Sequence, residues 1–217
     1  MAVQAPLVSR DHAHTVDNLP PDVEQAKYSA LGDVRVSAKY RFMAADHHSG
    51  GGLRFGLKLP SGSTDKEMAP GTPMEASLQP GTGSTDLILT GYTGWTRPDS
   101  HWSSLAQLQF QQVIADRNDY RPGTSISLDL GANYAISERV AGLLQLSILQ
   151  RARDHGGNAD PLGNSGGHAV FLSPGLSVTV VPGTHVYGFV QLPIRQYVNG
   201  EQLTPRWSTT LGVGFDL

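Results

Sequence analysis

Hydrophobic and polar residues alternate with a period of two along much of the chain. Between Ser125 and Tyr134 the even positions carry isoleucine, leucine, leucine, alanine and tyrosine, whereas the odd positions carry serine, serine, aspartate, glycine and asparagine. Successive side chains of a β-strand point to opposite faces of a sheet, so this segment is predicted to be a strand with one apolar and one polar face. Segments 34–42, 170–180 and 206–217 repeat the pattern, and no helical periodicity of comparable length competes with it. The chain is therefore predicted to be all-β.

The alternation defines ten candidate strands. Most of them are about 9–12 residues long, which is the length that a tilted strand needs to cross a bilayer. We expect these strands at residues 3–10, 33–43, 52–60, 85–95, 102–113, 124–135, 139–151, 169–180, 185–196 and 206–217.

The connections between these strands alternate in length, with short ones at 96–101 and 181–184. Transmembrane barrels have tight turns on the periplasmic rim and longer loops on the outer rim. An even number of strands places both termini on the short-turn rim. We therefore expect residues 1–217 to form a single domain, an antiparallel transmembrane β-barrel, with long outer loops near 11–32, 61–84 and 152–168.

Composition favours a barrel whose apolar faces point outward, toward lipid. Only 16% of the residues are charged, and the polar positions of the strands are often glycine, serine or threonine. A soluble barrel would place more lysine and glutamate on its surface. The alternative to a membrane barrel is a soluble lipocalin-like or sandwich protein, whose apolar residues would form a dry core. Aromatic residues stand near predicted strand ends, where an interfacial girdle would place them: Tyr40, Phe42, Trp95, Trp102, Tyr134, Tyr197 and Trp207.

Charge and cysteine content exclude several other classes. The net charge is -3, and no basic cluster is interleaved with aromatic residues, so we expect no nucleic-acid partner. The absence of cysteine excludes disulfides and zinc–thiolate sites. No apolar run reaches the length of a transmembrane helix. No signal peptide is present at the start of this chain, and we expect an export signal to precede Met1.

A basic stripe is the clearest candidate for a functional surface. On an inside-out barrel, five basic side chains from two adjacent strands face the lumen together. Unpaired cations on one wall repel one another and lose hydration, so they need acidic partners, water or a passing anion. The predicted lumen wall consists of the basic stripe Arg35, Lys39, Arg41, Arg54 and Lys58, its extension Arg195 and Arg206 near the outer rim, and the candidate acidic partners Asp129 and Asp216.

Two interpretations of the stripe stay open. A narrow barrel of about ten strands has little interior space, so internal salt bridges can fill the lumen and close it. In the second interpretation the lumen is open, and its basic wall attracts anions or carboxylates.

Histidines and serines provide no convincing metal or catalytic site. The histidines are spread over both predicted rims and lack four-ligand spacing, so we expect solvated loop residues and no metal or other cofactor. The neighbouring pairs Ser100–His101 and Ser165–His168 do not follow a nucleophile-elbow pattern, so we predict no catalytic residues. The eight histidines are His12, His14, His47, His48, His101, His155, His168 and His185.

Three segments resemble landmarks of one bacterial outer-membrane family. Residues 32–42 read GDVRVSAKYRF, residues 56–62 read GLKLPSG, and residues 78–86 read LQPGTGSTD. They are similar to a family that is named for a role in the meta-cleavage pathway of phenol degradation and is often labelled a transporter. Residues 193–217 fit the C-terminal end of that family, so the resemblance covers about residues 30–217.

The resemblance implies a Gram-negative outer-membrane barrel that takes up hydrophobic or aromatic small molecules. Members of the family begin with a signal peptide and further strands, which implies about 12 strands in an intact parent. The closing residues 214–217 read GFDL, and they resemble the terminal signature that the barrel-assembly machinery recognises. Outer-membrane lipid, this machinery and a small solute are therefore the expected partners.

We predict an outer-membrane channel or transporter for small hydrophobic or aromatic molecules, anionic ones included. The alternative is a closed structural or partner-binding barrel with a plugged lumen. A lipid-modifying barrel enzyme is the third hypothesis, and it would need a Ser–His pair oriented by a third group. We expect that the protein is not an enzyme.

Overall fold

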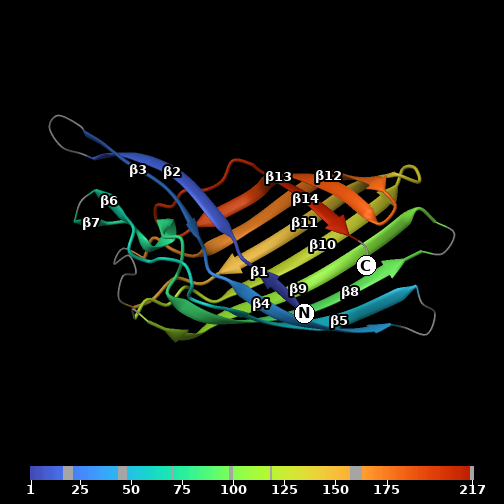
Figure 1. Ribbon diagram of the computed structural model, residues 1–217, viewed down its shortest axis with the longest axis horizontal. Coiled ribbons are helices and arrows are strands. Elements are labelled where there is room, and N and C mark those ends of the chain that lie inside the picture. The colour runs from blue at the N-terminus through green and yellow to red at the C-terminus, as the bar shows by residue number, and fades with distance from the viewer. Residues whose placement is uncertain are drawn as a thin grey trace.

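A ten-stranded antiparallel sheet forms the body of the protein (Figure 1). The computed structural model describes residues 1–16, 22–43, 48–69, 71–97, 100–117, 119–156 and 163–215. The strands of the sheet, in spatial order, are β1 (Ala2–Gln4), β4 (Arg35–Met43), β5 (Ser49–Lys58), β8 (Ser84–Thr96), β9 (Trp102–Asp116), β10 (Ser125–Ala135), β11 (Val140–Arg151), β12 (Gly167–Val181), β13 (Thr184–Val198) and β14 (Ser208–Phe215).

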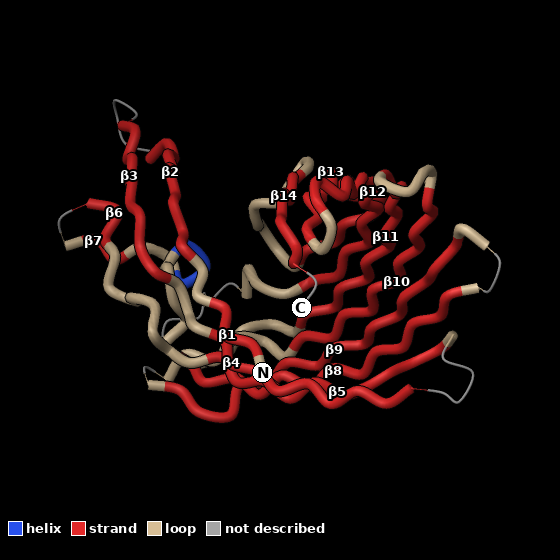
Figure 2. Tube along the Cα trace, turned by 45° about the vertical axis from the view of Figure 1, so that its right-hand side comes forward, coloured by secondary structure: helices blue, strands red, loops and turns tan. Residues whose placement is uncertain are grey.

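Each strand from β4 onward pairs with the next strand of the sheet, and Figure 2 shows the sheet curled along its whole width. Within the described residues the sheet is not closed, because β1 and β14 do not pair with each other. The predicted antiparallel barrel architecture is confirmed, and nine of the ten predicted strands match observed strands with bounds that agree to within three residues. That residues 1–217 form a single domain stays a prediction.

The first predicted strand is wrong. Residues 3–10 are divided between β1 and β2 (Leu7–Val16), and β2 pairs with β3 (Asp22–Leu31) in a separate hairpin. Pro6 stands at the division, where it has no N–H to donate to a ladder, and its carbonyl instead accepts a hydrogen bond of 2.8 Å from the Gly32 N–H. Most of the expected long loop 11–32 therefore lies in this hairpin, which extends away from the sheet in Figure 1.

The two ends of the strands carry connections of different length. We call one end the long-loop rim, because it carries residues 59–83, 117–124, 152–166 and 199–207 together with the β2–β3 hairpin. The other end is the short-turn rim, with the connections 97–101, 136–139 and 182–183. A second small hairpin, of β6 (Glu67–Ala69) and β7 (Thr72–Pro73), and the 3-10 turn η1 (Ala76–Leu78) also lie in the first long connection.

The apolar side chains of the strands lie on the exposed face of the sheet. On β5, Leu53 and Phe55 are 46% and 54% exposed, whereas Lys58 on the opposite face is only 4% exposed. Asp86 on β8 is 2% exposed. A soluble protein buries its leucine and exposes its lysine, so the arrangement is inverted and suits a wall whose outer face meets lipid. No helix among the described residues is long and apolar enough to span a membrane.

Exposed aromatic residues mark both rims of the outer face. At the short-turn rim the rings of Trp102 and Tyr134 lie side by side, with centroids 4.8 Å apart, and Tyr40, Phe42 and Trp95 are also exposed there. Tyr197 and Trp207 are exposed near the long-loop rim. Aromatic rings gather where hydrocarbon meets the headgroups of a bilayer, so the two rims have the composition of a membrane girdle.

Because the apolar side chains lie on the outer face, we expect a new charge to lower stability more on the outer face of the sheet than on the inner face. Leu130 lies on the outer face at the middle of β10, and Ser127 lies on the inner face of the same strand. We expect Leu130→Arg to lower the free energy of unfolding by about 2–4 kcal/mol, because arginine at the bilayer midplane loses its hydration. Ser127→Arg is the matched control and should cost less. Urea unfolding in phosphocholine vesicles measures both, and a larger loss for Ser127→Arg would contradict the orientation.

Candidate functional site

The basic stripe lies on one face of two paired strands. In the β4–β5 register Arg35 is opposite Lys58 and Lys39 is opposite Arg54. Directly opposed residues of an antiparallel pair share a face, and Arg41 is two residues beyond Lys39 on the same strand. The structure therefore places all five basic residues on the inner face, where Lys58 is buried.

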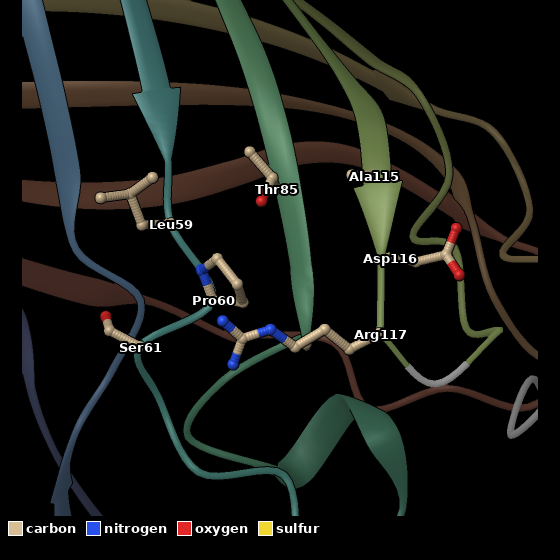
Figure 3. Close-up of a pocket in the computed structure, with 8 residues that line it drawn as sticks. Leu59, Pro60, Ser61, Thr85, Ala115, Asp116 and Arg117 are labelled. Atoms are coloured by element: carbon tan, nitrogen blue, oxygen red, sulfur yellow. The ribbon is translucent and has the colours of Figure 1, made fainter.

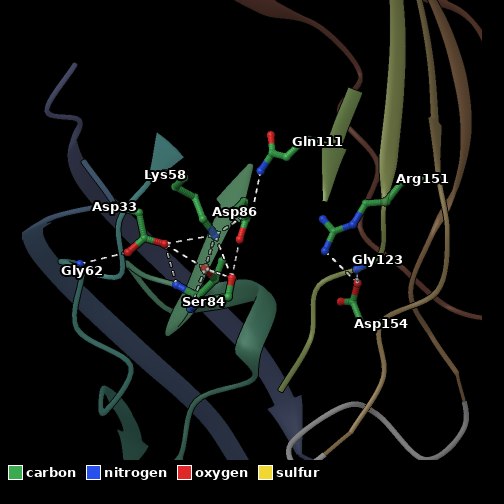
Figure 4. A network of polar contacts seen from close by, with 10 residues as sticks. Asp33, Lys58, Gly62, Ser84, Asp86, Gln111, Gly123, Arg151 and Asp154 are labelled. Carbon is green, nitrogen blue, oxygen red and sulfur yellow. Dashed lines mark hydrogen bonds and ion pairs between the residues drawn. The ribbon is translucent and has the colours of Figure 1, made fainter. Parts of the chain in front are cut away.

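Lys58 is the one stripe residue that forms ion pairs among the described residues. Its ammonium nitrogen lies 3.0 Å from Asp86 Oδ2 and 3.5 Å from Asp33 Oδ2. The side chains of all three residues are less than a tenth exposed. Two carboxylates therefore surround one ammonium group at the long-loop end of the inner wall (Figure 4).

Hydroxyl, amide and backbone groups complete this polar cluster. The Lys58 ammonium also donates to Ser84 Oγ at 3.0 Å and to Thr82 Oγ1, and the Ser84 hydroxyl donates to Asp86 Oδ1 at 2.7 Å. The Gln111 amide donates to Asp86 Oδ2 at 2.6 Å. A buried charge is tolerated only when its hydrogen-bonding capacity is used, and no buried side-chain polar atom of the described residues is left without a partner.

The cluster holds the first long connection against the barrel wall. Asp33 accepts from the backbone N–H of Gly62 at 3.0 Å and of Thr82 at 2.9 Å, which are near the two ends of residues 59–83. Gly62 and Gly81 lie so close that neither has room for a Cβ atom. The neighbouring wall thus fixes both ends of this connection, which contains β6, β7 and η1.

The other four stripe residues form no ion pair with any of the described residues. The Lys39 ammonium instead lies over the ring of Tyr92, 4.2 Å from its centroid. The ring of Tyr92 in turn packs on Gly52, where no Cβ would fit. A cation over an aromatic face is attracted by the ring quadrupole, so Tyr92 holds the Lys39 side chain at the inner wall without neutralising its charge.

A cavity of about 380 Å³ opens beside these unpaired cations. Arg35, Lys39 and Arg54 line it, together with Ile88 of β8 and Gln109 of β9. Ile88 and Gln109 share the face of the buried polar residues, because Ile88 alternates with Asp86 and Thr90, and Thr90 lies opposite Gln109. The cavity therefore lies on the lumen side of the wall.

A ladder of uncharged polar side chains continues this face across β9, β10 and β11. The acidic Asp129 of β10 lies among these side chains and accepts from Ser147 Oγ at 2.6 Å and from Gln145 Nε2 at 3.3 Å. Asp129 lies on the inner face of the sheet, and its partners there are these neutral donors instead of the predicted basic residue. The acidic partners of Lys58 are Asp33 and Asp86, which the sequence-based hypothesis missed.

Arg195 and Arg206, two other predicted lumen residues, have different positions in the structure. Arg195 is exposed and lies opposite Val170, on the outer face, because a register shift between Val170 and Phe171 changes the alternation along β13. The prediction that Arg195 lines the lumen is wrong. Arg206 is exposed in the connection before β14 and so does not belong to the wall. Asp216 lies outside the described residues.

The serine–histidine neighbours are engaged in other contacts. Ser100 Oγ accepts from the Trp102 N–H at 3.2 Å, and Ser165 Oγ accepts from the Asp154 N–H at 2.9 Å. The ring of His168 stacks on Tyr197, with centroids 5.1 Å apart. Among the described residues no group of three or more His, Asp or Glu side chains is arranged to hold a metal ion. His47 lies outside those residues.

A second polar cluster joins two connections at the long-loop rim. Asp154 accepts from Tyr120 Oη at 2.6 Å, from the Gly123 N–H at 2.7 Å and from Arg151 Nη2 at 2.8 Å. Burial, followed by the hydrogen bond to Asp154, raises the pKa of the Tyr120 phenol far above its ordinary value. The phenol therefore stays protonated and keeps donating to Asp154 at every physiological pH.

A cavity of about 500 Å³ lies at the same rim (Figure 3). Leu59, Thr85 and Ala115 line it, and the side chain of Arg117 points toward Pro60. Leu59 and Thr85 alternate with the inward Lys58 and Ser84, whereas Asp116 lies opposite Ser84 and also lines the cavity, so residues of both faces meet here at the end of the strands.

An antiparallel sheet of this curvature, with an apolar outer face and a polar, basic inner face, defines the class of transmembrane β-barrels. The chain belongs to the family described as "Putative MetA-pathway of phenol degradation", whose model matches residues 4–200. The fold is similar to the crystal structure of an outer membrane channel from Pseudomonas putida F1, with a TM-score of 0.69 and 11% identity over 88% of this chain and 70% of that chain. No curated protein matches the chain.

The buried cluster predicts a large effect of removing its single cation. Lys58→Met leaves the carboxylates of Asp33 and Asp86 buried without a counter-charge, so we expect a loss of about 3–5 kcal/mol in unfolding free energy. Lys39→Met removes a more exposed cation that lies over the Tyr92 ring and has no ion pair among the described residues, so we expect a loss of about 0.5–1 kcal/mol.

Denaturation of both variants in lipid vesicles measures this difference. Adding Asp33→Asn and Asp86→Asn to Lys58→Met should recover part of the stability, since no uncompensated charge then remains. Equal losses for Lys58→Met and Lys39→Met would show that the ion pairs do not hold the wall together.

Proposed function

We propose that the protein is an outer-membrane channel for small hydrophobic or aromatic molecules, anionic ones included. The observation that carries the proposal is the pairing of an exposed apolar outer face with unpaired cations around an inner cavity. The family to which the chain belongs is named for phenol degradation, and the channel from Pseudomonas putida F1 shares its fold. Both support an uptake role.

The proposed path runs from the long-loop rim through the lumen. In this orientation the long-loop rim faces the outside of the cell and the short-turn rim faces the periplasm, as in other barrels of this kind. Solute enters beside residues 61–84 and 152–168 and then passes Arg35, Lys39 and Arg54. Lumen width and the sign of the wall charge set selectivity. The barrel-assembly machinery and outer-membrane lipid are the proposed partners in assembly.

A closed barrel is the second candidate, and one observation favours it. Asp33, Lys58 and Asp86 form the kind of internal ion-pair cluster that fills a narrow lumen. Swelling of proteoliposomes in graded uncharged solutes separates the two candidates. A channel admits the smallest solutes and excludes larger ones, whereas a plugged barrel admits none.

Charge reversal in the stripe provides a sharper test of conduction. We expect Arg35→Glu combined with Lys39→Glu to shift ion selectivity toward cations, because the wall then attracts the opposite sign of charge. Reversal potentials across a planar bilayer with a salt gradient measure the shift. Arg195→Glu on the outer face is the control and should leave the reversal potential in place. An unchanged potential in the double variant would count against a conducting lumen lined by these residues.

A further inference from the structure

We propose that the lumen cavity is a binding site for small organic carboxylates with an apolar, aromatic-sized body. The inference rests on the proposed function, which it deepens by naming the chemical class that the wall retains during passage. The site is lined by the cations Arg35, Lys39 and Arg54 and by Ile88 and Gln109. Met1, Ala2 and Gln4 line it from the β1 edge of the sheet.

Charge is the first reason for a carboxylate. Three cations line the cavity, and no acidic residue is among its lining residues. The inward carboxylates nearby are already engaged, since Asp33 and Asp86 pair with Lys58 and Asp129 accepts from Ser147 and Gln145. Among the described residues the cavity therefore keeps an uncompensated positive charge, which an anion can neutralise.

The geometry of the cations is the second reason. Arg54 lies directly opposite Lys39, and Arg35 is two pairs further toward the long-loop rim on the same face. The planar guanidinium group donates two parallel hydrogen bonds to a carboxylate. Tyr92 orients the Lys39 ammonium through its ring, so the ammonium is held near Arg54 and supplies a third donor.

The remaining lining favours an organic anion over an inorganic one. Ile88 presents a branched apolar side chain to the cavity, and Gly56 leaves the β5 backbone uncovered beside it. Gln109, Gln4 and Ser37 add neutral polar groups. The volume of about 380 Å³ is within the range of about 300–1,000 Å³ of small-molecule sites. A cavity that is lined by both basic and apolar side chains suits an amphipathic carboxylate.

Equilibrium binding to the purified protein in neutral detergent tests the proposal. The probes are benzoate, benzyl alcohol as its uncharged analogue, acetate as the anion without a ring, and inorganic phosphate. Calorimetry at low ionic strength should give benzoate at least roughly tenfold higher affinity than the other three, because only benzoate combines the charge-assisted hydrogen bonds with the apolar contact.

Variants assign the binding to these residues. Lys39→Gln combined with Arg54→Gln should reduce benzoate to the affinity of benzyl alcohol and leave benzyl alcohol unchanged. Arg54→Lys keeps the charge without the planar fork and should bind benzoate with intermediate affinity. Arg139→Gln, in the exposed 136–139 turn, is the matched control and should bind benzoate as the parent does. Heat-dependent mobility on gels verifies that each variant is folded.

The results also separate this site from the channel proposal. The proposed site is ruled out if benzyl alcohol, acetate or phosphate binds as tightly as benzoate. It is also ruled out if the double variant binds benzoate as tightly as the parent protein does. Flux of uncharged phenol into vesicles is measured independently. If phenol passes but benzoate does not bind selectively, only the proposed carboxylate site is ruled out. If benzoate binds but phenol does not pass, the proposed channel function is ruled out.

Discussion

The rest of the structure depends on the absence of water on the outer side of the sheet. In hydrocarbon each backbone N–H and C=O needs a partner within the protein, so a spanning chain forms paired strands or helices. The same constraint places leucine, valine and phenylalanine outside and leaves the inside for groups that need hydrogen bonds. Exposed Leu53 and Phe55 and buried Lys58 and Asp86 are direct consequences. A basic inner wall is possible because the lumen, unlike the outer face, can hold polar partners.

The basic residues of the inner wall fall into two groups, one with ion pairs and one without ion pairs among the described residues. Near the long-loop rim, Lys58 is enclosed by Asp33 and Asp86 and fixes the connection 59–83. Farther along the same strands, Lys39 and Arg54 face a cavity without an acidic partner among its lining residues. Evenly paired charges would make a rigid plug, whereas this division combines a stable rim with a wall that can attract a solute. That combination is the physical basis for the proposed uptake function.

Alternation along the sequence was enough to predict most of the sheet, because a strand facing lipid on one side keeps a strict period of two. It failed at Pro6, where a missing N–H ends β1 and moves the next residues into the β2–β3 hairpin. It also failed at Arg195, because a one-residue register shift reverses the alternation and is invisible in a period-two pattern. Asp33 and Asp86 stood in the motifs that carry the family resemblance. Their pairing with Lys58 depends on strands that are far apart in sequence, so only the fold could reveal it.

Site-specific labelling tests the inversion most directly, and the chain contains no cysteine that would interfere. Ser127 and Leu128 are neighbours on β10 and lie on opposite faces of the sheet. In vesicles, Ser127→Cys should react with a small water-soluble maleimide, and Leu128→Cys should be protected from it. A fluorophore attached at position 128 should be quenched by quenchers carried on the lipids. The reverse pattern, with Leu128→Cys open to water and Ser127→Cys in contact with lipid, would contradict the inside-out wall and every functional conclusion drawn from it.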